Sequence, residues 1–201
     1  MAHLLSADPL MGALVEAHGQ LDEEQRTRGR PADAYGALVR SIMGQQLSTK
    51  AARTIYERLT GLYEGTTPTP QELIETNPDD LRGVGLSRAK ASYLRSLAEH
   101  VVAGELDLLG LADLPDEDVA AQLTAVKGLG QWTADMFMIF HLRRPDVLPV
   151  GDLGVRRGVE LAYGLKELPK AAELERIAQP WRPHRSLASL YLWRSLDNAP
   201  V

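Results

Sequence analysis

The 201-residue sequence contains no cysteine. This absence excludes disulfide bonds, thiolate zinc sites, a cysteine nucleophile and an iron–sulfur cluster held by cysteines. It fits a reducing compartment, and we expect a cytoplasmic protein. Long apolar runs are also absent, since the longest one, Met136 to Leu142, is far shorter than the roughly 20 residues that cross a bilayer. The first residues lack a basic segment followed by an apolar run, so we expect no signal peptide and no membrane partner.

Positive charge is scarce, because 22 lysines and arginines face 27 acidic residues and leave a net charge of −5. Nucleic-acid-binding proteins usually show a basic footprint, so the total charge argues against such a partner. The distribution leaves the question open. Arg143–Arg144 and Arg156–Arg157 flank one segment, whereas many acids gather at Asp113–Asp118. The five histidines do not have the spacing of metal ligands, and none is assigned such a role.

Helical signals dominate the chain, and no segment alternates with the period of two that is typical of strands. Thr69–Pro70 and Asn77–Pro78 each place a capping residue before a proline, which is typical of a helix start. Ser48 and Thr49 are suitable caps for a helix over residues 50–60. The other predicted helices cover approximately residues 33–47, 86–102, 115–126, 132–142, 169–178 and 186–195, and one begins at residue 152. We predict an all-α fold of nine or ten helices with short connections.

Two segments resemble each other. Both Leu81–Leu94 and Val126–Ile139 contain an apolar residue, a spacer, and a Gly-apolar-Gly turn that leads into a helix, with Ala89 and Ala134 at matching offsets. The similarity indicates two copies of a helix–hairpin–helix unit. Chance similarity between two helical connections explains it equally well, and both interpretations stay open.

The segment Leu123–Phe137 (LTAVKGLGQWTADMF) contains the most informative turn. Gly128 and Gly130 permit backbone conformations with positive φ, and they leave amide N–H groups uncovered at the start of the following helix. Such a helix N-terminus binds an anion, including a DNA phosphate, without any lysine or arginine. The alternative is an ordinary connection between two helices that ends in a glycine cap.

Asp152 follows Trp132 by 20 residues and opens another helix. An aspartate at this position caps the helix in one interpretation. In the other it is a carboxylate held beside a pocket that the second hairpin helix helps to form. The residues therefore leave two roles for Asp152.

The combined pattern LxxVxGxGxWTA…PxxD resembles the helix–hairpin–helix DNA glycosylase superfamily, and within it the 3-methyladenine DNA glycosylase II family. Further segments similar to that family are Ile42–Ala52, Leu81–Leu94 and Pro180–Trp193. The resemblance spans about Tyr35 to Trp193. It implies two helical lobes, residues 42–149 and residues 1–41 with 150–201, and a DNA-binding cleft between them. The short segment before Tyr35 implies a form without the additional N-terminal α/β domain that some members have.

The resemblance also implies roles for individual residues. Asp152 matches the catalytic aspartate, and Gln46 matches the residue that wedges into the duplex. The remaining matches are hairpin positions that hold DNA phosphate (Gly128, Gly130, Thr133), backbone carbonyls that ligate a Na⁺ or K⁺ ion (Thr124, Val126, Leu129), and base-pocket positions (Trp132, Met136, Leu153, Trp193). Met136 and Leu153 stand where some relatives have tyrosines, which implies a softer pocket that accepts alkylated purines and larger adducts such as ethenoadenine.

Several of these residues have a plainer alternative. Trp132 and Trp193 lie on apolar helices, where large aromatic side chains often belong to the core. Gln46 is a polar residue at the end of a helix. Trp181, between Pro180 and Arg182, is expected to anchor a loop by packing.

The implied chemistry is hydrolysis of an N-glycosidic bond after the damaged base is flipped out of duplex DNA. A buried carboxylate stabilises the positive charge that develops on the sugar, and an alkylated purine leaves without a second carboxylate because it is already cationic. Relatives that also cut the strand have a lysine nucleophile at the position of Trp132, and tryptophan forms no Schiff base. We therefore predict a monofunctional, monomeric enzyme for base excision repair that requires no cofactor. The alternatives are a non-catalytic helix–hairpin–helix DNA-binding protein and a glycosylase for deaminated or mismatched bases.

Overall fold

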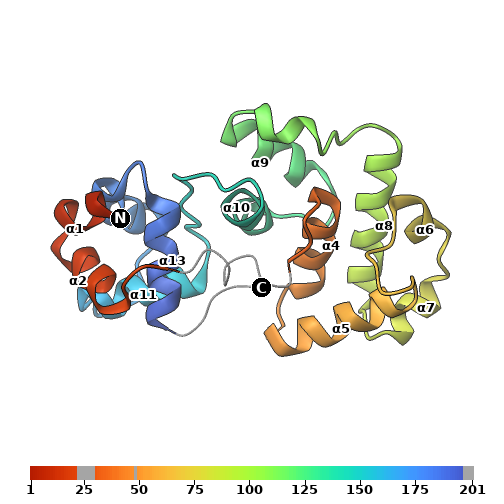
Figure 1. The fold of residues 1–201 in the computed structure, drawn as a ribbon, viewed down its shortest axis with the longest axis horizontal. Coiled ribbons are helices and arrows are strands. Elements are labelled where there is room, and N and C mark those ends of the chain that lie inside the picture. The colour runs from red at the N-terminus through yellow and green to blue at the C-terminus, as the bar shows by residue number, and fades with distance from the viewer. Residues whose placement is uncertain (22–29, 48, 197–201) are drawn as a thin grey trace. The chain divides into compact units, whose positions relative to one another are not determined.

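The computed structural model describes residues 1–21, 30–47 and 49–196. Over these ranges it contains α-helices and short 3₁₀ helices and no strand (Figure 1), which confirms the all-α prediction. In the same ranges no helix is both long enough and apolar enough to span a membrane.

By their internal contacts the described residues form two compact units. Unit 1 contains residues 1–21 and 138–196, and unit 2 contains residues 30–47 and 49–137. The division falls inside one helix, α10 (Gln131–Phe140), whereas the sequence placed it near residue 149. The segment after α10 joins unit 1 because it bonds to the start of the last described helix, where the Ser186 amide donates to the Pro145 carbonyl at 3.1 Å.

Unit 2 consists of α4 (Ala34–Gly44), α5 (Thr49–Gly61), α6 (Pro70–Glu75), α7 (Pro78–Gly83), α8 (Arg88–Val102), the 3₁₀ helix η1 (Gly110–Asp113), α9 (Asp116–Ala125) and most of α10. Unit 1 consists of the end of α10, α1 (Ala2–Ala7), α2 (Pro9–His18), α11 (Leu153–Tyr163), α12 (Ala171–Ile177), the 3₁₀ helix η2 (Gln179–Trp181) and α13 (Arg185–Ser195).

Side-chain caps start many of these helices, as the sequence predicted. Thr69 and Glu72 form a capping box at α6, and the Asn77 side chain accepts from the Asp79 amide at α7. At the start of α8 the Ser87 hydroxyl, which was not among the predicted caps, accepts from the Lys90 amide. Ser48, a predicted cap of α5, lies outside the described residues. These caps are local interactions, so the order of residues alone indicates them.

The predicted number of helices was wrong, since the described residues form twelve α-helices. The two additional helices, α1 and α2, lie near the N-terminus. Asp8 caps α2 and Pro9 is its first residue, which is the same cap-then-proline signal that was recognised at α6 and α7. The missed helices therefore had a local signal of the kind already in use.

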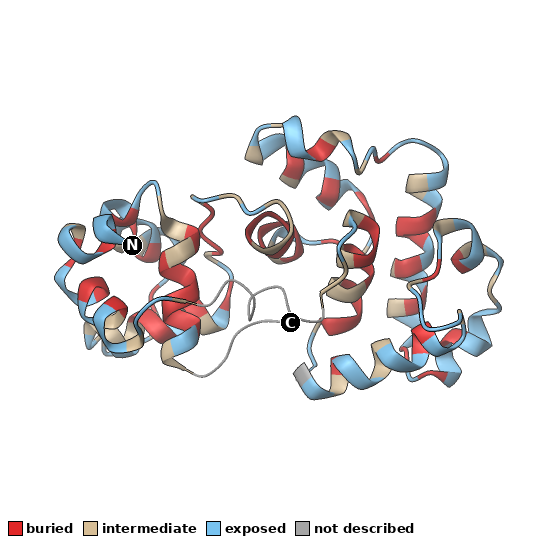
Figure 2. Cartoon of the chain, viewed as in Figure 1, coloured by how far each residue is buried: buried red, intermediate tan, exposed pale blue. Residues whose placement is uncertain are grey.

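Each unit has its own buried core (Figure 2). In unit 2, α8 packs against α4 and α6 and buries Leu94 and Leu97. In unit 1, α13 packs against α2 and α11, and Gly158 lets α11 approach α13 so closely that a Cβ atom there would lie 2.9 Å from Leu192. Trp181 is fully buried in this unit and confirms the predicted loop anchor.

Candidate functional site

The hairpin of unit 2 joins α9 to α10. The Val126 amide donates to the Leu123 carbonyl at 3.1 Å and ends α9, and the Leu129 amide donates to the Val126 carbonyl, also at 3.1 Å. The Gly130 carbonyl then accepts from the Ala134 amide, so Gly130 is the capping residue of α10. Because glycine has no side chain to cover the first-turn N–H groups, this helix start is a suitable site for an anion.

The two hairpin glycines differ in backbone conformation and in the space around them. Gly128 has a φ of +95°, and a Cβ atom there would lie 2.1 Å from Cγ of Tyr93 on α8. Gly130 is not among the residues with positive φ, and a Cβ atom there would meet nothing within 4 Å. Of the two glycines that permit a positive φ, Gly128 alone uses this freedom. Gly128 allows the turn and its packing, whereas Gly130 leaves open space in front of the helix.

A groove of about 540 Å³ lies beside the hairpin and is formed by residues of unit 2 alone. It brings together many of the predicted DNA-contacting positions with the end of α4 and one residue of α8. Its lining residues are Gln45, Gln46, Tyr93, Gly128, Leu129, Gly130, Trp132 and Thr133. Gln46 is exposed and Trp132 is half-buried, so both present surface to the groove.

The turn between α4 and α5 forms one edge of this groove. Gln46 is one of the few non-glycine residues with a left-handed backbone, with a φ of +58°. The Gln45 side-chain amide donates to the Gly128 carbonyl at 2.9 Å and to the Thr133 hydroxyl at 3.3 Å. Thr133 is thus a buried side-chain acceptor inside the hairpin, and any phosphate contact from it comes from its backbone.

Asp152 lies in unit 1, at the start of α11. Its Oδ1 atom accepts from the Val155 amide at 2.8 Å and from the Trp193 indole N–H at 2.8 Å, and the residue is only 7% exposed. Asp152 therefore caps the helix, as one interpretation of the sequence predicted, and it is a buried, oriented carboxylate. Its place beside a pocket of the hairpin stays a prediction.

Trp193 holds this carboxylate from α13. It is 1% exposed, it stacks on Phe140 with ring centroids 5.7 Å apart, and a Cβ atom at Gly154 would lie 2.9 Å from its Cδ1 atom. Trp193 therefore has a core position and a hydrogen-bonding role toward Asp152. Its predicted contact with a substrate base stays a prediction.

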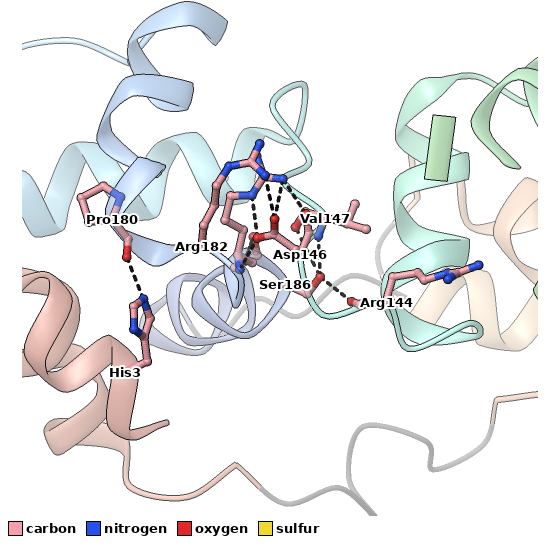
Figure 3. Close-up of polar contacts among 9 residues, drawn as sticks. His3, Arg144, Asp146, Val147, Pro180, Arg182 and Ser186 are labelled. Carbon is pink, nitrogen blue, oxygen red and sulfur yellow. Dashed lines mark hydrogen bonds and ion pairs between the residues drawn. The ribbon is translucent and has the colours of Figure 1, made fainter. Parts of the chain in front are cut away.

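Ion pairs and a serine hydroxyl join the segment before Asp152 to Arg182 and to the first residues of α13 (Figure 3). Asp146 bonds to Arg182 at 2.9 Å and to Nε of Arg185 at 2.8 Å, and the Ser186 hydroxyl donates to the Arg144 carbonyl at 2.7 Å. Burial alone would raise the pKa of Asp146, but the hydrogen bonds and charges of the two arginines outweigh it and lower the pKa. A carboxylate held in its charged form in this way fixes the loop that leads to Asp152.

The other predicted site residues differ in exposure. Met136 lies on α10 and is 3% exposed, whereas Leu153, which directly follows Asp152, is 64% exposed. Val126 and Leu129 are buried side chains in the hairpin, and Thr124 is exposed in the last turn of α9. The part of the chain that the structure describes has no group of three or more His, Asp or Glu side chains that could hold a metal ion.

The similarity between the two glycine-containing segments does not extend to their backbones. In the first segment Gly85 has the positive φ, at +105°, and Gly83 is the last residue of α7. In the hairpin the first glycine, Gly128, has the positive φ. The two turns therefore have different conformations, and the interpretation of two equivalent hairpins was wrong at this level.

Sequence reasoning assigned no site role to Lys90 or Tyr93, which the structure places against the groove region. Lys90 donates to the Met43 and Gln45 carbonyls, both at 2.7 Å, and Tyr93 packs against Gly128. The two residues stand three apart on α8 and so share one face of that helix. This spacing was the only signal available in the sequence, because their partners lie on distant segments.

The geometry defines a class: a helical protein with a helix–hairpin–helix turn whose glycines leave the first-turn amides of α10 uncovered, and a buried, oriented carboxylate later in the sequence. Residues 39–183 match the model of the HhH-GPD superfamily base excision DNA repair proteins. The match spans more than half of the sequence, and the chain belongs to this family.

Similar proteins and structures support this assignment. The DNA-3-methyladenine glycosylase 1 of Schizosaccharomyces pombe is 33% identical over 195 residues, which cover 96% of this chain and 85% of that protein. A solved S. pombe 3-methyladenine DNA glycosylase in complex with abasic DNA has a TM-score of 0.88 at 30% identity, covering 98% of this chain and 96% of that one. A Bacillus halodurans DNA-3-methyladenine glycosidase structure has a TM-score of 0.81 at 38% identity, covering 96% of this chain and 86% of that one.

Proposed function

We propose that the protein is a monofunctional DNA N-glycosylase that excises alkylated purines from duplex DNA in base excision repair, as a cytoplasmic, DNA-associated monomer. The observation that carries this function is the Asp152 carboxylate, which is buried and oriented by two N–H donors on one oxygen. A protein that only binds DNA needs this residue as a helix cap alone, and an uncharged serine or asparagine would fill that role without repelling phosphate.

Asp152 acts on the sugar of the extruded nucleotide. As the C1′–N bond breaks, its electrons leave with the purine and positive charge develops on the sugar. The carboxylate stabilises that charge and orients a water, which adds to C1′ and loses a proton. An N3- or N7-alkylated purine carries a positive charge before the bond breaks, so it departs as a neutral base without a general acid.

The groove of unit 2 binds the DNA around the extruded nucleotide. The first-turn amides of α10, behind Gly128 and Gly130, bind a backbone phosphate, and Gln46 fills the gap that the flipped base leaves in the stack. A cationic purine stacks on Trp132, whose ring attracts positive charge. Met136, Leu153 and Trp193 are further residues proposed to contact the purine, and the small number of aromatic rings among them favours larger adducts such as ethenoadenine.

An alkali-metal ion, Na⁺ or K⁺, fits the hairpin in its donor chemistry. The carbonyls of Thr124, Val126 and Leu129 are neutral oxygen donors near the end of α9, where helix carbonyls lack intrahelical donors. The Val126 carbonyl already accepts from the Leu129 amide and has a second lone pair for an ion. When bound, the ion would supply positive charge to a DNA phosphate.

We expect DNA affinity to fall when K⁺ is replaced by tetramethylammonium, which is too large for three carbonyls. The comparison is made at constant ionic strength so that counterion release is unchanged. Fluorescence anisotropy with a duplex containing an abasic site measures the affinity. Equal affinity in the two salts would contradict the ion site and leave the glycosylase function untouched.

The function itself is tested by incubating the chain with methylated duplex DNA and separating the released bases. We expect 3-methyladenine and 7-methylguanine in the soluble fraction, and a light-scattering mass of one chain. Borohydride should trap no enzyme–DNA adduct, because Trp132 provides no amine. Release from uracil or mismatched duplexes instead would favour the alternative substrates. DNA binding without release of any base would indicate a non-catalytic protein, and a trapped adduct would contradict the monofunctional assignment.

A further inference from the structure

The exposed turn that contains Gln46 has a left-handed backbone conformation that is unfavourable for most residues. α4 ends at Gly44, the Leu47 amide donates to the Gly44 carbonyl at 3.1 Å, and Gln46 has a φ of +58°. Residues other than glycine rarely adopt this left-handed backbone conformation unless contacts with the surrounding structure stabilise it. Something outside the turn must therefore stabilise it.

Lys90 of α8 provides one such restraint. Its ammonium group donates to the Met43 carbonyl and to the Gln45 carbonyl, both at 2.7 Å. These carbonyls belong to the end of α4, where acceptors lack intrahelical donors and where a positive charge is favourable. Burial lowers the pKa of Lys90, whereas hydrogen bonds to the two carbonyls favour its charged form. The lysine thus fixes the backbone immediately before Gln46.

Gln45 provides the second restraint and links the turn to the hairpin. Its side-chain amide donates to the Gly128 carbonyl and the Thr133 hydroxyl. Gly128 in turn lies against Tyr93, one helical turn after Lys90 on the same face of α8. One face of α8 therefore supports both the turn with Gln46 and the glycine turn that precedes the phosphate-binding amides.

We propose that Lys90 and Gln45 are positioning residues that hold Gln46 at a fixed place beside the hairpin, so that phosphate binding and filling of the vacated base stack occur together. Neither residue touches the reacting sugar. The inference rests on the proposed glycosylase function and adds residues to which no role had been assigned. Its consequence is that loss of either restraint slows reactions in which the damaged base must first leave a paired stack.

The test uses two duplexes with the same 7-methylguanine strand. In one the lesion faces cytosine, and in the other it faces an abasic site, where extrusion costs less because no pair is broken. We expect Lys90→Met to slow single-turnover excision from the paired duplex by about tenfold or more, since small misplacements cost at least this much. Excision opposite the abasic site should change far less. Gln45→Met should show the same selectivity if Lys90→Met does not fold.

Two controls define the effect. Arg95→Met removes one positive charge from the exposed surface of α8, where Arg95 bonds to Glu99, and it should leave both rates unchanged. Lys90→Arg keeps a cation that can donate to two carbonyls and should recover part of the lost rate. An equal loss on both substrates, or a loss of the same size in Arg95→Met, would overturn the positioning role.

Hydrogen exchange at the Leu47 amide gives a measurement that is independent of activity. Its bond to the Gly44 carbonyl reports whether the turn is closed. We expect faster exchange at Leu47 in Lys90→Met than in the wild type, with unchanged exchange in α13. Unchanged exchange at Leu47 would overturn the positioning role, even if the wild type excises alkylated purines. A wild type that excises no base would overturn the proposed glycosylase function, and the exchange measurement would still show whether Lys90 holds the turn.

Discussion

Replacement of Asp152 by asparagine is expected to slow base excision by on the order of 10²- to 10³-fold, the usual loss when one electrostatic contact to a transition state is removed. Asparagine keeps an oxygen that can accept from the Val155 amide and the Trp193 indole, so the cap of α11 is retained. Affinity for a duplex with an abasic site should not fall, because the lost group is an anion. Rapid-quench excision assays and anisotropy measure the two quantities.

Asp8 offers a matched control in the same unit. Like Asp152 it is a buried carboxylate that caps a helix, and it accepts from the Trp181 indole at 3.0 Å and from the Tyr163 hydroxyl. Burial would raise the pKa of Asp8, but these donors and two backbone amides outweigh it and lower the pKa. Asp8→Asn should therefore lower stability and leave the excision rate per folded molecule unchanged. Equal excision by wild type and Asp152→Asn would show that Asp152 is not the catalytic carboxylate.

Local interactions explain why much of the helical architecture could be predicted. The Thr69–Glu72 capping box and the Asn77 cap each involve residues within three positions of one another. Their geometry depends on adjacent backbone alone, so residue order is enough to indicate them. The same argument applies to Asp8 and Pro9, and α2 was missed although its signal was present.

The contacts that organise the site could not be predicted in this way. The bond from Gln45 to Gly128 joins residues 83 positions apart, and the bond from Lys90 to Met43 joins residues 47 positions apart. Such contacts depend on how α4, α8 and the hairpin pack, and a periodic pattern identifies the buried face of a helix without identifying its partner. Sequence reasoning could therefore name Gln46 as a wedge and still miss the side chains that hold it.

Asp152 combines two features that the sequence presents as alternatives. The cap and the catalytic group appeared as alternatives because each explains an aspartate at the start of a helix. In the structure the capping bond from Val155 and the indole bond from Trp193 both end on Oδ1. The cap thus helps to orient the carboxylate, so the capping role is compatible with the catalytic role proposed above.

Replacement of Gly128 by alanine is expected to reduce the free energy of unfolding by roughly 3 kcal/mol, as a sum of backbone strain and overpacking. Alanine would have to adopt a φ of +95°, and its Cβ atom would lie 2.1 Å from Cγ of Tyr93. Either the hairpin or α8 must then move. Because Gly128 also accepts the bond from Gln45, this movement should weaken DNA binding together with stability. Urea denaturation and anisotropy measure the two effects.

Gly130→Ser, at the neighbouring hairpin glycine, separates the effect on stability from the effect on DNA binding. A side chain fits there, since a Cβ atom would meet nothing within 4 Å, and serine is a favourable cap for α10. Stability should therefore be kept, or rise by only a few tenths of a kcal/mol, because glycine is itself a tolerated cap. The serine hydroxyl would, however, accept from the first-turn amides that are proposed to bind phosphate, so DNA affinity should fall. If Gly130→Ser binds DNA as tightly as the wild type, the amides of α10 are not the phosphate site, whatever Gly128→Ala does to stability.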